Sequence, residues 1–170
     1  SCGMERVKVF APADGVPARG GGGIPSRGGV GLFAQALMAR HPLLPVEEEG
    51  RLNDPVLREN FIERVFAYRR LRDLCASDWR RGDVVAFHTA HKLQLMAHSP
   101  EAYRALGRLV AGVRDAARAA FRERYARDFM RALALRASRG RNANVLQHMA
   151  GYLRDGLDAA ARAELSEAIH

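Results

Sequence analysis

Helix-start signals recur from residue 54 to the end of the chain, and they restrict the fold more than any other feature of the sequence. Asp54 and Pro55 fit the N-cap and the first position of a helix, Ser99-Pro100-Glu101 repeats this pattern, and Asp158 caps another segment. Apolar residues at helical spacing lie between these signals. We therefore predict a helical bundle or array with short connections after residue 52.

About six helices are expected in this part of the chain. Pro55 opens the first, which ends near residue 77, and Asp83 opens the second, which ends near residue 98. The others are expected from residue 100, over residues 113–136, over residues 139–156, and after Asp158.

The first fifty residues have a different pattern. Residues 5–10 alternate apolar and charged side chains, as a short strand does, and the Gly- and Pro-rich residues 11–29 predict a flexible loop. Residues 30–42 have helical spacing that ends at Pro42. We therefore predict a mainly α chain with an all-helical domain over 52–170, preceded over 1–51 by the remnant of an α/β domain. Because a strand without its sheet has unpaired backbone groups, this remnant is expected to be disordered or loosely packed.

The positive charge is unevenly distributed. Residues 1–50 carry five basic and five acidic side chains, whereas residues 51–170 carry 22 and 14, so the whole net charge of +8 lies in the second part. Of the 27 basic residues 25 are arginine, which fits phosphate recognition by guanidinium groups or an arginine-rich genome. Because no apolar run is long enough to span a bilayer and no secretory signal is evident, a cytoplasmic location is expected.

Arginine clustering favours a nucleic-acid partner over simple solvation of the helices. Residues 102–141 hold eleven arginines against three acids, and residues 64–92 hold seven basic residues against three acids. Such density suits a phosphate backbone, although solvated helix faces are the plainer alternative. The arginines expected to contact phosphates are Arg69, Arg70, Arg72, Arg80, Arg81, Arg139 and Arg141.

Histidines share one helical stripe in the expected helix over 83–98. At 100° per residue, His88, His91 and His98 fall together, with Lys92 at the edge, and the later helix offers a similar polar stripe. Buried core histidines are one interpretation, and a metal site built from His88, His91 and His148 is another, weakened by the lack of a carboxylate. We favour one wall of a cationic groove near a bound nucleotide, formed by His88, His91, Lys92, Asn144 and His148.

The two cysteines predict no self-contained metal site or disulfide framework. Cys2 and Cys75 are far apart and form no C-x-x-C pair. Cys75 lies near Leu71 and Leu74, so it is most simply a small core residue.

Three stretches of the helical part resemble the YbgA-type helical domain. They are "LNDPVLRENFIERVFAYRRLRDL", "GDVVAFHTAHKLQLMAHSPEAYRALGRLV" and "RGRNANVLQHMAGYLRDG", and they occur in the order found in that family. The resemblance covers roughly residues 52–170. It implies that the last helices of the family domain lie beyond His170.

The first fifty residues resemble the C-terminal part of TudS-type desulfidases, on "SCGMERVKV", "GVGLFAQALM" and "PVEEEGRL". Those enzymes remove sulfur from thiolated uracil with a [4Fe-4S] cluster held by three cysteines, the last of them in a Ser-Cys-Gly motif. The resemblance makes Cys2 that ligand and places Ser1 near the open iron as a catalytic candidate. The other two cysteines belong to the missing half of that domain, so this chain alone is not expected to hold the cluster or to be active.

Chains that join these two domains resemble RNA desulfidases, which convert thiouridine in tRNA to uridine. The expected function is therefore part of a tRNA-thiouridine desulfidase whose helical domain binds RNA. Two alternatives remain open. In the first, the helical domain is a separate enzyme, or a module for a small ligand or a metal, that uses the face of His88, His91 and His148. In the second, it is a structural or oligomerisation module.

Overall fold

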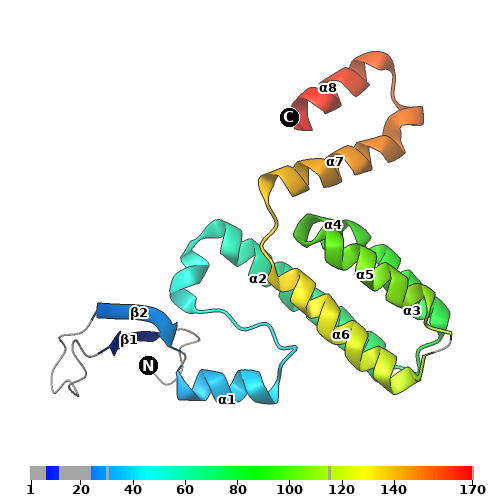
Figure 1. The fold of residues 1–170 in the computed structure, drawn as a ribbon. Coiled ribbons are helices and arrows are strands. Elements are labelled where there is room, and N and C mark those ends of the chain that lie inside the picture. Colours follow the sequence, from blue (N-terminus) through cyan, green and yellow to red (C-terminus); the bar gives the residue numbers. More distant parts are fainter. Residues whose placement is uncertain (1–6, 12–23, 30, 115, 170) are drawn as a thin grey trace. The chain divides into compact units, whose positions relative to one another are not determined.

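The structure, a computed structural model, describes residues 7–11, 24–29, 31–114 and 116–169 (Figure 1). It separates into two compact units, Ser1–Phe61 and Ile62–His170. Helices make up most of the described chain, so the predicted mainly α class is confirmed. None of the described helices is both long enough and apolar enough to cross a lipid bilayer.

The first unit contains two strands and one α-helix before α2. Strand β1 (Val7–Ala11) agrees with the prediction, and helix α1 (Leu32–Arg40) lies within the segment predicted to be helical. The prediction of a loop throughout 11–29 is wrong, because β2 (Ile24–Gly29) pairs antiparallel with β1. The Gly- and Pro-rich composition of this segment hid the strand, whose backbone groups are satisfied by a neighbour within the chain. The expectation that β1 has no pairing partner is therefore also wrong.

Helix α2 (Pro55–Ala76) begins where the sequence predicts, after a 3-10 turn over Glu49–Asn53. The side chain of Asp54 accepts hydrogen bonds from the backbone N–H groups of Val56 at 2.8 Å and Leu57 at 3.3 Å, as an N-cap residue does. The division between the two units falls within this helix. The domain boundary at residue 52 stays a prediction.

The helix predicted over 83–98 is two helices, α3 (Arg81–Ala90) and α4 (Lys92–His98). His91 leaves the helical conformation at φ −101° and ψ 6° and separates them. Asp83 is not the N-cap. It occupies the third helical position, where its carboxylate accepts a hydrogen bond from the backbone N–H of Arg80 at 2.6 Å. This extra break gives seven α-helices between residues 55 and 169, within the described chain.

The remaining helices start at side-chain caps or close to their predicted positions. Ser99 caps α5 (Pro100–Ala111) at 3.1 Å from the N–H of Ala102, and Ser138 caps α7 (Arg139–Leu153). Helix α6 (Arg118–Ala134) starts five residues later than predicted. Asp158 caps α8 (Ala159–Ile169) at 2.8 Å from the N–H of Ala161.

Helix α4 is central in the second unit. It packs against α5, α6 and α7, while α5 also packs against α3 and α6, and α8 packs on α7 (Figure 1). Apolar side chains from several helices fill the core between them. The most deeply buried of these are Leu71, Leu95, Leu106, Phe129 and Leu133.

His98 joins three segments at the end of α4. Its Nδ1 lies 2.6 Å from the carbonyl oxygen of Leu135, which follows α6, and its Nε2 lies 2.9 Å from a carboxylate oxygen of Glu63 on α2. Arg141 on α7 donates to the carbonyl oxygen of His98 at 2.7 Å. This junction connects α2, α4 and α7.

Acidification is expected to weaken the His98 junction through Glu63. The hydrogen bond from His98 lowers the pKa of Glu63, so the folded chain binds that proton less readily than the unfolded chain. The associated stability is complete above the unfolded pKa of about 4.3 and is lost as the pH falls through the folded value. Glu63→Gln should therefore flatten the dependence of unfolding free energy on pH below about 5. It should also cost about 1 kcal/mol at neutral pH, since the carboxylate is partly exposed.

The measurement is urea unfolding followed by circular dichroism at several pH values. Glu59→Gln is the control, because Glu59 lies one turn earlier on α2, is exposed, and has no ion pair within the described residues. If Glu63→Gln and Glu59→Gln show the same dependence of unfolding free energy on pH, the stabilising role assigned to the hydrogen bond between His98 and Glu63 is wrong.

Candidate nucleic-acid interface

Lys92 and Tyr152 join α4 to α7 at the surface of the second unit. The ammonium group of Lys92 donates a hydrogen bond to the Tyr152 hydroxyl at 2.7 Å and lies 4.8 Å from the centroid of its ring. The hydrogen bond raises the pKa of Lys92, so the side chain stays cationic. Tyr152 nevertheless remains 66% exposed. The pair therefore presents a positive charge and an aromatic surface to solvent.

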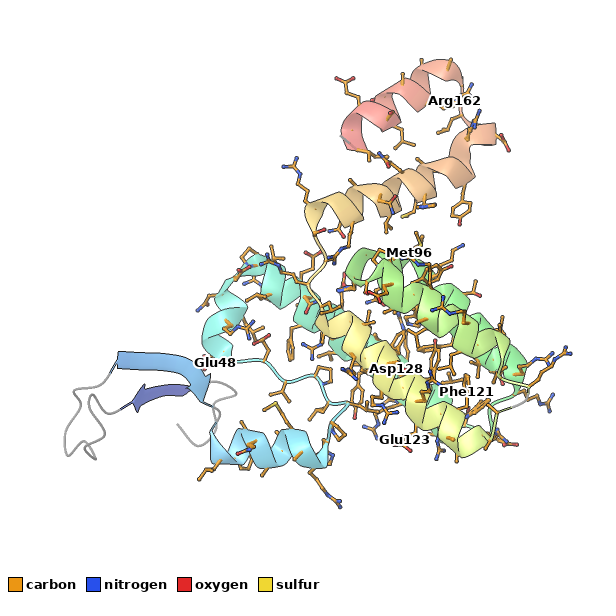
Figure 2. All side chains as sticks on the ribbon, in the orientation of Figure 1. Glu48, Met96, Phe121, Glu123, Asp128 and Arg162 are labelled. Carbon is orange, nitrogen blue, oxygen red and sulfur yellow. The ribbon has the colours of Figure 1, made fainter. Side chains whose placement is uncertain are left out.

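Asn144 and His148 extend this surface along α7. They precede Tyr152 by eight and four residues, so the three side chains share one helical face, and all three are exposed. We call Lys92, Asn144, His148 and Tyr152 the α7 polar face. Figure 2 labels Met96 on α4, in the part of the fold where that helix packs against α7. The sequence predicted Lys92, Asn144 and His148 as members of this face and placed Tyr152 only at the edge of its helical stripe, although its spacing of four from His148 indicates a shared face.

His88 and His91 do not belong to this exposed face. They retain 9% and 4% of their accessible surface and lie in a cluster of aromatic side chains. The prediction that they directly contact a nucleotide is corrected, because helical periodicity groups side chains on a face without fixing whether that face meets solvent. The plainer interpretation, buried core histidines, is the one that fits.

The two buried imidazoles have different partners. His88 places Nδ1 3.2 Å from the hydroxyl of Tyr125 and stacks on Tyr103 with an interplanar angle of 4°. His91 donates from Nδ1 to the carbonyl oxygen of Phe87 at 2.8 Å, which leaves Nε2 as a buried acceptor without a hydrogen-bond partner among the described residues. Burial lowers the pKa of both imidazoles, so both are held in the neutral form.

The seven predicted phosphate-binding arginines fall into two groups. Arg69 pairs with Asp73 at 3.0 Å, Arg72 lies over the ring of Tyr68, and Arg141 donates to backbone carbonyls at the His98 junction. Arg141 therefore has a structural role. Exposed guanidinium groups with no ion pair among the described residues make up the other group, Arg70, Arg80, Arg81 and Arg139.

These arginines do not line one groove. Arg118, the first residue of α6, donates to the backbone carbonyl of Trp79, so Arg80 and Arg81 lie near the start of α6. Arg139 follows Leu135, at the other end of that helix. Seventeen helical residues separate these ends, which corresponds to about 25 Å. A partner that contacts Arg80 and Arg81 as well as Arg139 must therefore be large.

A groove that the sequence did not predict lies between α5 and α6. Its volume is about 330 Å³, and its lining includes Leu106 and Leu109 together with Arg124, Asp128 and Arg131. Figure 2 labels Asp128 on α6. Arg124 pairs with Asp128 at 3.8 Å, whereas Arg131 is exposed and has no ion pair among the described residues. This groove adds one available guanidinium group to the surface.

The predicted iron–sulfur residues, Ser1 and Cys2, lie outside the described residues. Cys75 is half-buried on α2, and burial raises the pKa of its thiol, which disfavours the thiolate that ligates iron. Within the described ranges, no three His, Cys, Asp or Glu side chains gather closely enough to hold a metal ion. The described residues therefore do not fit a [4Fe-4S] cluster, nor the metal site considered for His88, His91 and His148.

The buried imidazoles should make the fold sensitive to mild acid. Their lowered pKa values mean that the unfolded chain binds protons first as the pH drops below about 6.5, so stability is lost in that direction. Each contributes a slope of up to about 1.4 kcal/mol per pH unit. His91→Phe should flatten the dependence of unfolding free energy between pH 7 and pH 5, as measured by urea unfolding. His148→Ala, at an exposed site, is the control, and an unchanged slope in His91→Phe would refute the interpretation.

Comparison with known proteins finds one family and one relative that resemble this chain. Residues 92–170 match the family described as "Protein of unknown function (DUF1722)". The chain is 31% identical over 107 residues to "Uncharacterized protein YbgA" of Escherichia coli (strain K12), which covers 62% of this chain and 63% of that protein. The chain thus spans less than two thirds of the length of this relative. No solved structure matches the chain. Residues 92–170 are thus similar to the DUF1722 family, and the chain is similar to YbgA over 107 residues.

Proposed function

We propose that the helical unit binds RNA and that it does so as the RNA-binding part of a tRNA-thiouridine desulfidase. One observation carries the first half of this proposal. Residues 62–170 hold 20 of the 27 basic and 12 of the 19 acidic side chains, whereas residues 1–61 hold seven of each. The net charge of the protein therefore belongs to the helical unit alone. A polyanion is the partner that such a surface attracts.

Exposed arginines without ion pairs favour an RNA partner over the alternative of helix surfaces that only water contacts. Many exposed arginines on protein surfaces are neutralised by acids one turn away, as Arg124 and Arg127 are on α6. Arg70, Arg80, Arg81, Arg131 and Arg139 have no ion pair among the described residues, so their guanidinium groups are free for phosphate oxygens. Arg80 and Arg81 lie near the start of α6, and Arg131 and Arg139 lie near its end, a separation that fits an extended partner such as a folded RNA.

The second half of the proposal depends on the resemblance of the first fifty residues to TudS-type desulfidases. In that setting Cys2 is a ligand of the [4Fe-4S] cluster, Ser1 lies near the substrate sulfur, and residues outside this chain complete the site. The helical unit holds the tRNA while the cluster domain removes sulfur. A cytoplasmic location follows from the substrate.

An interaction module is the second candidate, and one observation favours it. Leu146, Met149 and Leu153 on α7 are 46%, 45% and 56% exposed. They recur at helical spacing, which makes an apolar stripe that another helix or another copy of the chain can cover. RNA affinity distinguishes the two candidates.

The test of RNA binding is a filter-binding titration of unfractionated tRNA at two salt concentrations. We expect the apparent affinity to fall steeply with salt, because each neutralised phosphate releases a counterion. Arg80→Ala with Arg81→Ala should weaken binding and lower the slope of log affinity against log salt by about 1 to 2.

The matched control removes two positive charges from residues 1–61, which hold equal numbers of basic and acidic side chains. Arg40→Ala with Arg58→Ala changes two exposed arginines there and should leave the slope unchanged. Salt-independent binding, or no binding at all, would remove the RNA proposal and leave the interaction module.

The desulfidase assignment is tested in a protein that joins this chain to a segment with the two other cluster cysteines of the TudS-type motifs. After anaerobic cluster reconstitution, we expect conversion of thiouridine to uridine in tRNA, measured by nucleoside analysis. Cys2→Ala should abolish conversion and keep tRNA affinity within about twofold, because the helical unit is intact. Full activity of Cys2→Ala would contradict its role as a cluster ligand.

A further inference from the structure

We propose that Tyr152 is a stacking platform for an unpaired base of the bound RNA, and that Lys92 holds the tyrosine ring in place and contacts the adjoining phosphate. This inference rests on the RNA-binding function proposed above. It deepens that function by naming the part of the RNA that meets the α7 polar face, an unpaired nucleotide rather than a duplex.

Tyr152 is unusual in the helical unit because its ring is exposed, whereas most other aromatic side chains there are not. Phe121, Tyr125 and Phe129 are nearly fully buried and contact one another in the core. Of the described aromatic side chains from residue 62 onward, only Phe66 and Tyr152 are exposed, at 61% and 66%. Phe66 lies among the exposed apolar side chains of α2, whereas Tyr152 has Lys92 and His148 beside it as well as the apolar Met149 and Leu153. Tyr152 is therefore the exposed ring whose neighbours suit a nucleotide.

Lys92 fixes the position of the ring before any ligand arrives. Its hydrogen bond to the hydroxyl and its place 4.8 Å from the ring centroid restrict the side-chain rotation of Tyr152. A ring that is already positioned loses less entropy when a base stacks on it. The ammonium also adds a positive charge beside the stacked base, where a phosphate of the same nucleotide lies.

An unpaired base is the partner that fits this arrangement. Bases inside a duplex are already stacked on each other, so an exposed aromatic side chain stacks only on bases in loops, bulges or single strands. Asn144 and His148 lie on the same face and offer hydrogen-bond donors and acceptors to a base edge or a ribose hydroxyl.

Tyr152 borders the apolar stripe of α7. At 100° per residue it lies about 60° from Met149 and about 100° from Leu153, whereas Asn144 and His148 lie about 100° or more from Leu146, Met149 and Leu153. A helix or a second copy that covers the apolar stripe therefore leaves Asn144 and His148 open and meets the edge of the Tyr152 ring. Charge also separates the two faces, since Lys92 lies beside the polar one.

The experiment compares two RNA probes with equal numbers of phosphates, a single-stranded oligouridylate and a blunt duplex. Tyr152→Ala should lower the affinity for the single strand about 5- to 150-fold and leave its salt slope unchanged, because stacking releases no counterions. Duplex affinity should stay within about twofold. Tyr152→Phe should lose much less single-strand affinity than Tyr152→Ala, because it keeps the ring that stacks on the base and loses only the hydrogen bond by which Lys92 positions that ring.

Thermal unfolding of each variant and its mass in solution complete the design. Equal losses in Tyr152→Ala and Tyr152→Phe, or equal losses for both probes, would overturn the inference, since both point to the Lys92 hydrogen bond as a structural tie. An unchanged RNA affinity with an altered oligomeric mass in Tyr152→Ala would assign the ring to a protein interface. If the native chain shows no salt-sensitive RNA binding, the proposed function fails, whereas salt-sensitive tRNA binding that is indifferent to Tyr152 defeats only the stacking platform.

Discussion

The hydrogen bonds of His98 connect the elements that any binding surface in the helical unit depends on. One ring nitrogen holds the segment after α6, the other holds Glu63 on α2, and the backbone oxygen of His98 receives Arg141 from α7. Because α7 begins at this junction, its direction relative to α4 is constrained there. The contact between Lys92 and Tyr152 constrains the far end of the same helix. The α7 polar face is therefore held at two points.

Three histidines and one arginine have roles other than those that their chemistry first suggests. Three histidines, His88, His91 and His98, are buried and contribute to the core rather than to a ligand or metal site. The guanidinium group of Arg141 likewise donates hydrogen bonds to the backbone carbonyls of His98 and Arg136. What remains available to a partner is a set of separated guanidinium groups, together with one lysine and one aromatic ring. That combination suits attraction of a large polyanion with local recognition of a single nucleotide.

Local signals were predicted well from the sequence, and signals that depend on tertiary contacts were not. Asp54, Ser99 and Asp158 cap helices as predicted, because a cap bonds to backbone groups two or three residues away. The break at His91 escaped prediction, since apolar periodicity continues through it. The sequence also did not show which sides of α3 and α4 face the core, so His88 and His91 were assigned to the surface. Strand β2 was missed because its pairing with β1, not its composition, makes it a strand.

Photo-crosslinking of the chain to a tRNA that contains thiouridine, followed by mass spectrometry of the digested protein, tests the central claim most directly. The account predicts crosslinked peptides from α7 around Tyr152 and from the start of α3 around Arg80, both lost in high salt. Crosslinks confined to residues 1–61, or distributed over the chain without loss in high salt, would contradict it.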